Sequence, residues 1–529
     1  MKILSKKGRA VLLGSILSMW ASGCDSTATG TEDPSTTEDP VTEGTPTSQP
    51  DRGGIGMLPP PPPQQQQSPP PPPQDPPPPP PPQDPPPPPP PVTSGVDPQR
   101  SLAVTDDAIL SKFTLQTVMD QLVGTSGVPT TALDLFHQWW DTERPAPGLG
   151  AGPHCDSPGI ANMNGFPYPC RPAEGGQALV DPFINATTNP NAYLPVGLFN
   201  RFDLAPANGA NCGEYRIVFA KRSGITNPRD RLFVIFEAVL PNPTPALGLE
   251  GCRPVANFWA GLTADADVNS RGDKLHDFYF LGLPGFMPVF HVDNLGNRAS
   301  NTGQVRINQF MQPTWNLREF KIRKNCGAGA CTVQFTPVTV KTNPGGILFN
   351  PGSTHARTAD FQNVVFPDQV ASLAVNDINR FGLSIPDAFN SGQSDEQNPQ
   401  ENHYVNQFGA GPSPLRANIQ NKLSAIGSTL TPDQVVARAM ALSCAGCHRL
   451  SNGANLGSGI IWPPSLGFTH TSELTDPGPD GPRHRLSPAL VGTFLPHRKE
   501  VLDTFLSAAC GDNVCDSWET QATCSADCQ

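Results

Sequence analysis

The chain has 529 residues, which is long enough for several domains, and its 65 prolines are clustered rather than evenly spread. The formal net charge of −12 at pH 7 argues against nucleic acid as a partner, because phosphate binding needs clustered lysine and arginine. No run of about eighteen consecutive apolar residues occurs, which excludes a helix that spans a membrane.

Residues 1–23 have the pattern of an export signal. A basic start with Lys2 and Arg9 is followed by a short apolar run that ends at Ala21. Small residues then precede Cys24, and this arrangement resembles a bacterial lipobox, whose cysteine carries the lipid and becomes the new N-terminus. Ala21 stands where leucine is usual, so a secretory signal cut near the same place is the alternative. Lipidation of Cys24 implies a membrane anchor, at the outer membrane or cell surface or on the periplasmic face.

Residues 24–100 are expected to form a disordered stalk. An acidic part rich in serine and threonine is followed, from Pro59 to Pro91, by little besides proline broken by glutamine and aspartate. Such a stretch has no side chains to bury and is expected to be extended polyproline II. At about 3.1 Å per residue it would span on the order of 100 Å and separate the folded part from its anchor.

Residues 101–428 are predicted to form a β-rich α+β domain with irregular loops. Aromatic and β-branched runs between turn residues predict strands, and apolar residues at helical spacing predict helices. The clearest unit is a hairpin whose loop lies between Cys326 and Cys331. The predicted strands are 214–221, 231–240, 318–324 and 332–341, and the predicted helices are 111–123 and 132–140.

The 13 cysteines fall into groups along the chain. When Cys24 and the close pair Cys444 and Cys447 are set aside, the remaining groups are even. In an oxidising compartment this suggests three disulfides in the middle domain and two in the tail. The sequence does not determine the connectivity, although pairing of neighbours is the simplest arrangement. The disulfide candidates are Cys155, Cys170, Cys212, Cys252, Cys326, Cys331, Cys510, Cys515, Cys524 and Cys528.

Residues 429–509 open with a helix signal that leads into a compact motif. Thr431 is a predicted N-cap, followed by proline at the first helical position and glutamine at the third. The helix runs into Cys444-Ala-Gly-Cys447-His448. Thiols at this spacing reach the two vinyl groups of one porphyrin edge, and the adjacent histidine then faces the iron. An ordinary disulfide within the motif is the alternative.

This segment resembles the small cytochromes c, in which a capped helix also ends at such a motif. The resemblance implies a small all-α domain with one covalent haem c held by Cys444, Cys447 and His448. A second helix is predicted over 498–509.

The second axial ligand of the iron departs from the cytochrome pattern. Small cytochromes c use a methionine after the motif, whereas the last methionine of this chain is Met440. His470, at the end of an aromatic, proline-containing loop that starts at Trp462, is the predicted ligand. His497, His484 and an open position are the alternatives.

Two further resemblances are weaker in what they imply. The segments Asn200-Arg-Phe-Asp-Leu-Ala-Pro206 and Trp315-Asn-Leu-Arg-Glu-Phe-Lys321 resemble an uncharacterised group of bacterial surface lipoproteins that end in a haem motif. Residues 510–529 resemble short cysteine-rich modules at the ends of bacterial surface proteins. A small disulfide knot is expected there, with Ca²⁺ binding by its acidic side chains as the alternative. Those side chains are Asp512, Asp516, Glu519 and Asp527.

The sequence therefore predicts a multidomain envelope lipoprotein, with a proline-rich stalk, a disulfide-stapled β-rich domain, an all-α cytochrome c-like domain and a cysteine-rich tail. The leading functional hypothesis is one-electron transfer through the haem to a redox partner protein. A redox enzyme with its substrate in the β-rich domain, or a surface binding or adhesion protein, are the alternatives. The sequence does not decide whether the protein is an enzyme.

Overall fold

The computed structural model describes residues 95–144, 153–311, 315–327, 329–396, 401–508, 515 and 525–528. The predicted signal peptide, Cys24 and the predicted stalk as far as Ser94 lie outside these residues. From Gly95 onward the described residues belong to one compact unit. Packing begins a little earlier than expected, because Val96 is buried and a short helix, α1, occupies Pro98–Ser101.

An antiparallel sheet in the order β1-β4-β5-β6-β7-β8-β10, with β9 paired to β8, forms the centre of this unit. The predicted β-rich middle region is thereby confirmed, and so is the hairpin of β8 and β9. Two separate hairpins, β2-β3 and β11-β12, lie outside this sheet. The strands are β1 (Ala103–Val104), β2 (Asn162–Met163), β3 (Phe166–Pro167), β4 (Tyr193–Arg201), β5 (Asn211–Lys221), β6 (Leu232–Pro241), β7 (Gln304–Gln309), β8 (Asn316–Asn325), β9 (Thr332–Val338), β10 (Gln393–Asp395), β11 (Thr471–Gly478) and β12 (Gly481–Leu486).

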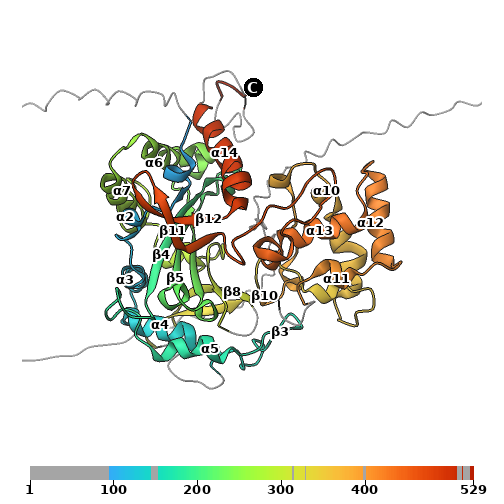
Figure 1. Cartoon of the computed structure of the whole chain (residues 1–529), viewed down its shortest axis with the longest axis horizontal. Helices are drawn as coiled ribbons and strands as arrows, with labels where there is room; N and C mark the ends of the chain where they lie inside the picture. The colour runs from blue at the N-terminus through green and yellow to red at the C-terminus, as the bar shows by residue number, and fades with distance from the viewer. Residues whose placement is uncertain are drawn as a thin grey trace, which may run out of the picture. The chain divides into compact units, whose positions relative to one another are not determined.

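One face of the sheet is covered by helices, which Figure 1 shows as α2, α3, α4, α6 and α7 beside β4 and β5. Trp139 of α4 stacks on Phe335 at 4.3 Å between ring centroids and contacts Phe236 and Phe320 edge-on. These aromatic contacts explain the burial of this face, because large rings remove much apolar area from water.

A second group of helices lies in the later part of the chain, where α13 contacts α10, α11 and α12 and these four helices lie together in Figure 1. The helices are α2 (Asp107–Leu110), α3 (Leu115–Ser126), α4 (Ala132–Asp141), α5 (Pro172–Gly175), α6 (Arg253–Ala264), α7 (Val268–Phe280), α8 (Thr358–Asp360), α9 (Phe366–Asp368), α10 (Val370–Leu373), α11 (Tyr404–Phe408), α12 (Pro414–Ala425), α13 (Pro432–Leu442) and α14 (Leu495–Ser507), with π-helical turns η11 (Gly446–Leu450) and η12 (Leu490–Phe494).

The segment expected to be all-helical differs from that expectation. Helices α13 and α14 occur where the sequence predicts them, but the hairpin β11-β12 lies between them. The hairpin contacts β4 of the central sheet, and Thr471 donates a hydrogen bond to the Val196 carbonyl at 3.0 Å. The chain between the two helices is therefore shaped by the sheet on which it packs.

The disulfides follow the predicted neighbour pairing in the middle region but not in the tail. The pairs Cys155–Cys170, Cys212–Cys252 and Cys326–Cys331 join neighbouring cysteines. In the tail, Cys515 pairs with Cys528, so neighbour pairing is wrong there. Cys510 and Cys524 lie outside the described residues. Disulfides of this kind are typical of exported proteins.

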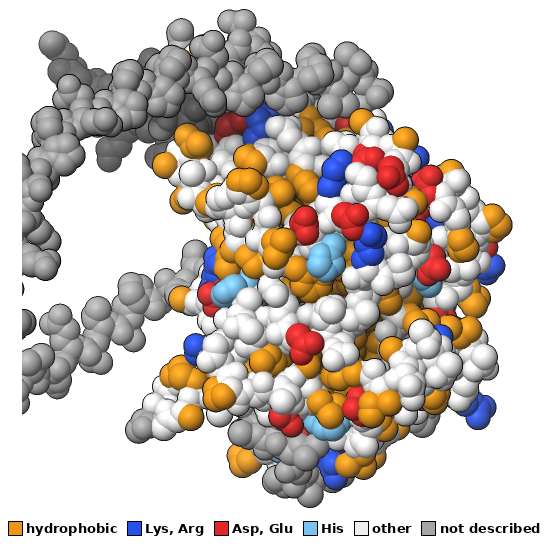
Figure 2. Space-filling view, turned by 90° about the vertical axis from the view of Figure 1, so that its left-hand side faces the viewer, with side chains coloured by type: hydrophobic (Ala, Val, Ile, Leu, Met, Phe, Trp, Pro, Cys, Tyr) orange, Lys and Arg blue, Asp and Glu red, His pale blue; other side chains and the backbone are white. Residues whose placement is uncertain are grey.

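The surface carries charges of both signs. On the face in Figure 2, acidic and basic side chains are interspersed with hydrophobic and uncharged ones, without a basic patch. Among the helices that the structure describes, none has the length and apolar composition to cross a membrane. A group of charged side chains that includes Arg216, Glu237 and Arg306 is instead buried, on the second face of the sheet.

Candidate functional site

The Cys444–His448 motif follows α13 through a defined break in the helix. The Thr431 hydroxyl accepts a hydrogen bond from the Gln434 backbone amide, and the Thr431 backbone amide donates to the Gln434 side chain, as in a capping box, which confirms the predicted helix start. The helix ends at Leu442. The Ser443 hydroxyl then donates to the Met440 carbonyl at 2.7 Å and accepts from the Gly446 amide at 3.1 Å. These bonds turn the chain from α13 into the π-helical turn η11, a type of turn common at functional sites.

Gly446 is required by the closeness of this turn. A Cβ atom at position 446 would lie 1.7 Å from the Met440 carbonyl oxygen, which is backbone and cannot move aside cheaply. The small residue inside the motif therefore allows η11 to fold back against the end of α13.

Two histidines of the site, His448 and His470, each have a hydrogen-bond partner at Nδ1. Nδ1 of His448 donates to the Phe468 carbonyl at 2.8 Å, and Nδ1 of His470 is 2.9 Å from the Ser487 hydroxyl. The ring centroids are 4.9 Å apart, and Nε2 of His470 is 3.3 Å from the sulfur of Cys447. A histidine whose Nδ1 is engaged in this way presents Nε2 as a metal ligand.

The bond between His448 and Phe468 depends on an unusual backbone conformation. Phe468 has a φ of 68°, in the left-handed region, which is strained for a bulky residue. Its carbonyl also accepts a hydrogen bond of 2.9 Å from the Asn308 amide on β7. Trp315 donates to Asn308 and stacks on both Phe468 and His448, at 4.7 and 5.6 Å between centroids. The position of His448 is thereby linked to the central sheet.

The two cysteines of the motif are in different states. Cys444 is a buried free thiol, and burial raises its pKa to about 11. Cys447 is disulfide-bonded, and since Cys444 is free the two do not pair with each other. The alternative of a disulfide within the motif is therefore not what the structure shows.

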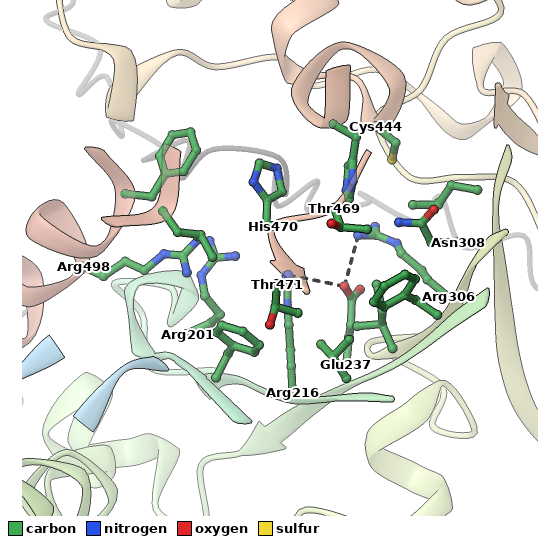
Figure 3. Close-up of a pocket in the computed structure, with 18 residues that line it drawn as sticks. Arg201, Arg216, Glu237, Arg306, Asn308, Cys444, Thr469, His470, Thr471 and Arg498 are labelled. Atoms are coloured by element: carbon green, nitrogen blue, oxygen red, sulfur yellow. Dashed lines mark hydrogen bonds and ion pairs between the residues drawn. The ribbon is translucent and has the colours of Figure 1, made fainter. Parts of the chain in front are cut away.

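A cavity of about 90 Å³, partly open to solvent, lies between the motif and the second face of the sheet. This volume is smaller than the roughly 300–1,000 Å³ of most ligand sites, so a bulky ligand would require the walls of the cavity to move apart. Figure 3 shows its polar side chains converging from the sheet below and from the C-terminal segment above. The lining residues are Phe199, Arg201, Arg216, Val218, Phe233, Ile235, Glu237, Arg306, Asn308, Leu317, Cys444, His448, Thr469, His470, Thr471, Leu490, Phe494 and Arg498.

The floor of the cavity is a row of charges across neighbouring strands. Arg216 on β5 lies opposite Glu237 on β6 in the sheet register. Glu237 is 3.4 Å from Arg216 and 3.2 Å from Arg306 of β7 (Figure 3). Arg306 also bonds Glu319 at 3.1 Å. Although burial raises the pKa of Glu237, the two arginines lower it more, so its carboxylate stays ionised. The row is thus a set of mutually paired buried ions.

Both histidines are neutral in this environment. Burial lowers the pKa of His448 to about 4, with the charge of Arg306 as a further cause. Burial and the neighbouring His448 and Arg498 hold the pKa of His470 well below its ordinary value. Neutral imidazole is the form that binds a metal.

The structure therefore brings together Cys444, His448 and the predicted ligand His470, all of which line the cavity. His484 bonds the Ser472 carbonyl and His497 lies on α14, and neither lines the cavity. Among the described residues, no group of three or more His, Cys, Asp or Glu side chains is placed to hold a metal ion. Of the acidic side chains named for the alternative of Ca²⁺ binding in the tail, Asp527 is described, whereas Asp512, Asp516 and Glu519 lie outside the described residues.

Sequence reasoning missed the charged part of the cavity, which comprises Arg201, Arg216, Glu237, Arg306 and Arg498. A signal for two of them exists, because Glu237 and Arg306 are the single charged residues of strands β6 and β7. Their common face follows only from the strand register. The distinctive segments that begin at Asn200 and Trp315 supply Arg201 and the stacking ring beside His448.

Comparisons of the sequence with protein-family models and curated proteins, and with solved structures, give no match.

We expect Gly446→Ala to destabilise the protein, because its Cβ would overlap the Met440 carbonyl and force η11 away from α13. As a matched control, Gly261→Ala places a Cβ in open space on α6 and should stabilise by up to about 1 kcal/mol. The urea midpoint of each variant measures both effects. A Gly446→Ala protein as stable as the parent would contradict the close turn.

Proposed function

We propose that the cavity is the site of one covalent haem c and that the protein transfers single electrons in the cell envelope. The observation that carries this proposal is the pair His448 and His470, each held at Nδ1, with Nε2 of His470 turned toward the sulfur of Cys447 in the same motif. Haem attachment uses thiols and a histidine at this spacing.

The residues of the cavity fit the chemistry of a haem. Its apolar side chains suit a flat hydrophobic ring, and its arginines suit the two carboxylates that a haem carries. Two conditions accompany this fit. The Cys447 disulfide must be reduced, because a thioether uses the same sulfur. The two imidazoles, whose ring centroids are 4.9 Å apart, would also have to separate if both were to hold an iron placed between them.

The chain supplies orientation and a controlled environment. The Phe468 carbonyl and Asn308 fix the ring plane of His448, and Ser487 fixes His470. A bound haem supplies a centre that gains and loses one electron. The row of Arg216, Glu237 and Arg306 places fixed charges beside that centre, and nearby charge and hydrogen bonds tune redox potentials.

We further propose that the protein is exported and anchored in the membrane through a lipid on Cys24. The observed disulfides support an extracytoplasmic location. The basic and apolar signal residues before Cys24 support the anchor.

Covalent haem should depend on both motif cysteines. After expression with cytochrome c maturation proteins, the chain should keep haem peroxidase staining on a denaturing gel, because thioether bonds survive unfolding. Replacing Cys444 and Cys447 by alanine should remove the stain, whereas replacing Cys326 and Cys331 should keep it. Absence of stain from the parent protein would refute the haem proposal.

Ligation by His448 and His470 should give a low-spin absorption spectrum and a potential below that of His/Met cytochromes. His470→Ala should then give a high-spin spectrum and binding of carbon monoxide. The control is His497→Ala, which leaves both cavity histidines in place. If the parent protein is already high-spin and binds carbon monoxide, His470 is not the second ligand.

Cys24→Ser should release the protein from membranes, since a lipid anchor cannot form on serine. Haem staining should be unchanged, because the motif is intact. Membrane fractionation and the mass of the N-terminal peptide test this. An unlipidated parent protein in the soluble fraction would show that a secretory signal was used.

A further inference from the structure

Arg498 is a buried cation with little negative charge close to it. Its side chain is 6% exposed, and its Nε has no hydrogen-bond partner among the described residues. The nearest carboxylate oxygen, from Asp203, is 4.0 Å from that nitrogen. Arg498 lines the cavity at the start of α14, so its guanidinium belongs to the wall of the site.

Two more arginines stand beside it. Figure 3 shows the guanidinium groups of Arg201 and Arg498 close together on the same side of the cavity, with Arg216 rising from the sheet near Thr471. Arg201 is paired with Asp203 at 3.0 Å, and Arg216 with Glu237 at 3.4 Å. Asp203 therefore accepts close hydrogen bonds from Arg201 and attracts Arg498 from a longer distance.

The pairing of the cavity's arginines leaves Arg498 the most weakly neutralised. Arg201, Arg216 and Arg306 each have a carboxylate within 3.4 Å, whereas the carboxylate near Arg498 is 4.0 Å away. Burial, followed by the charge of Arg201, holds the pKa of Arg498 well below its ordinary value, which reflects the cost of this cation in its surroundings. An uncompensated buried ion typically costs several kcal/mol, and an anionic ligand would offset that cost.

We propose that Arg498, together with Arg201 and Arg216, binds the carboxylate of an organic acid whose apolar body lies against the apolar wall of the same cavity. Guanidinium groups bind carboxylates through paired hydrogen bonds. The wall includes Leu490 and Phe494, which lie on η12 just before α14. An acid with an apolar body matches this combination better than an inorganic anion does.

Two kinds of molecule could supply this carboxylate, and the arginines would bind both in the same way. One is a side chain of the proposed haem, in which case the inference rests on the proposed function. The other is a free organic acid bound beside the histidines, as in the redox-enzyme alternative. The arginine site itself follows from the contacts of Arg498 and does not require haem.

The test uses the full-length chain without haem, titrated with sodium hexanoate or neutral hexanamide at constant ionic strength. Hexanoate should raise the melting temperature in a saturable way, whereas hexanamide should not, because only the acid carries the recognised charge. Absence of a hexanoate effect on the parent chain would overturn the proposal.

Arg498→Met tests the residue. It should weaken hexanoate binding at least about tenfold, because the charged partner is lost. It should leave the melting temperature without ligand unchanged or higher, since an apolar side chain of similar size replaces an uncompensated ion. Arg498→Lys should bind with intermediate affinity. The control is Arg485→Met, because Arg485 is 45% exposed, pairs with Asp476 and does not line the cavity. Equal hexanoate binding by the parent and Arg498→Met would exclude Arg498 as the binding group.

The two sources are distinguished by repeating the titration on chain that carries haem. Hexanoate binding that is lost in the haem-loaded chain identifies the haem carboxylate as the natural occupant. Binding retained in both forms identifies a free acid. If the gel stain shows that no haem attaches at all, the haem-free titration still decides the arginine site independently.

Discussion

The buried row of charges on one face of the central sheet is the constraint on which the site depends. Removing an ion from water costs several kcal/mol unless a partner is placed beside it, so Arg216, Glu237 and Arg306 must stay in register. Antiparallel pairing provides that register, because Arg216 and Glu237 are directly opposite and Arg306 is on the next strand. A sheet with this face exposed would keep its charges solvated, but here the C-terminal segment covers it.

The cover and the sheet are connected by specific contacts rather than by apolar packing alone. Asn308 of β7 bonds the same Phe468 carbonyl that orients His448, and Ser394 of β10 accepts a hydrogen bond from the Ala445 amide at 3.0 Å. The motif is thus held from two strands of the sheet. On the proposed function, the β-rich region forms one wall of the haem site and supplies its electrostatic environment.

Much of the local structure could be predicted, because it is encoded in short stretches of sequence. The strand runs around Arg216 and Glu237, the stapled hairpin at Cys326–Cys331 and the capped helix at Thr431 all have local signals, and the structure contains each of them. The motif and His470 were identified as candidates for the same reason.

Features that depend on the tertiary fold could not be predicted in this way. Arg498 and Arg201 meet across almost 300 residues of sequence, and no local pattern encodes their approach. The β11-β12 hairpin forms against β4, so a segment with helices at both ends contains strands as well. Cys515 pairs with Cys528 rather than with its neighbour, a choice that the order of the cysteines along the sequence does not encode.

The most direct test of the account is the intact mass, under denaturing conditions, of the exported protein produced with the haem attachment machinery. Alkylation of free thiols before the measurement reports the state of Cys444 and Cys447 in the same experiment. The account predicts one haem per chain and no alkylation at either position. A mass without a haem increment, with Cys444 alkylated and Cys447 still in its disulfide, would contradict it.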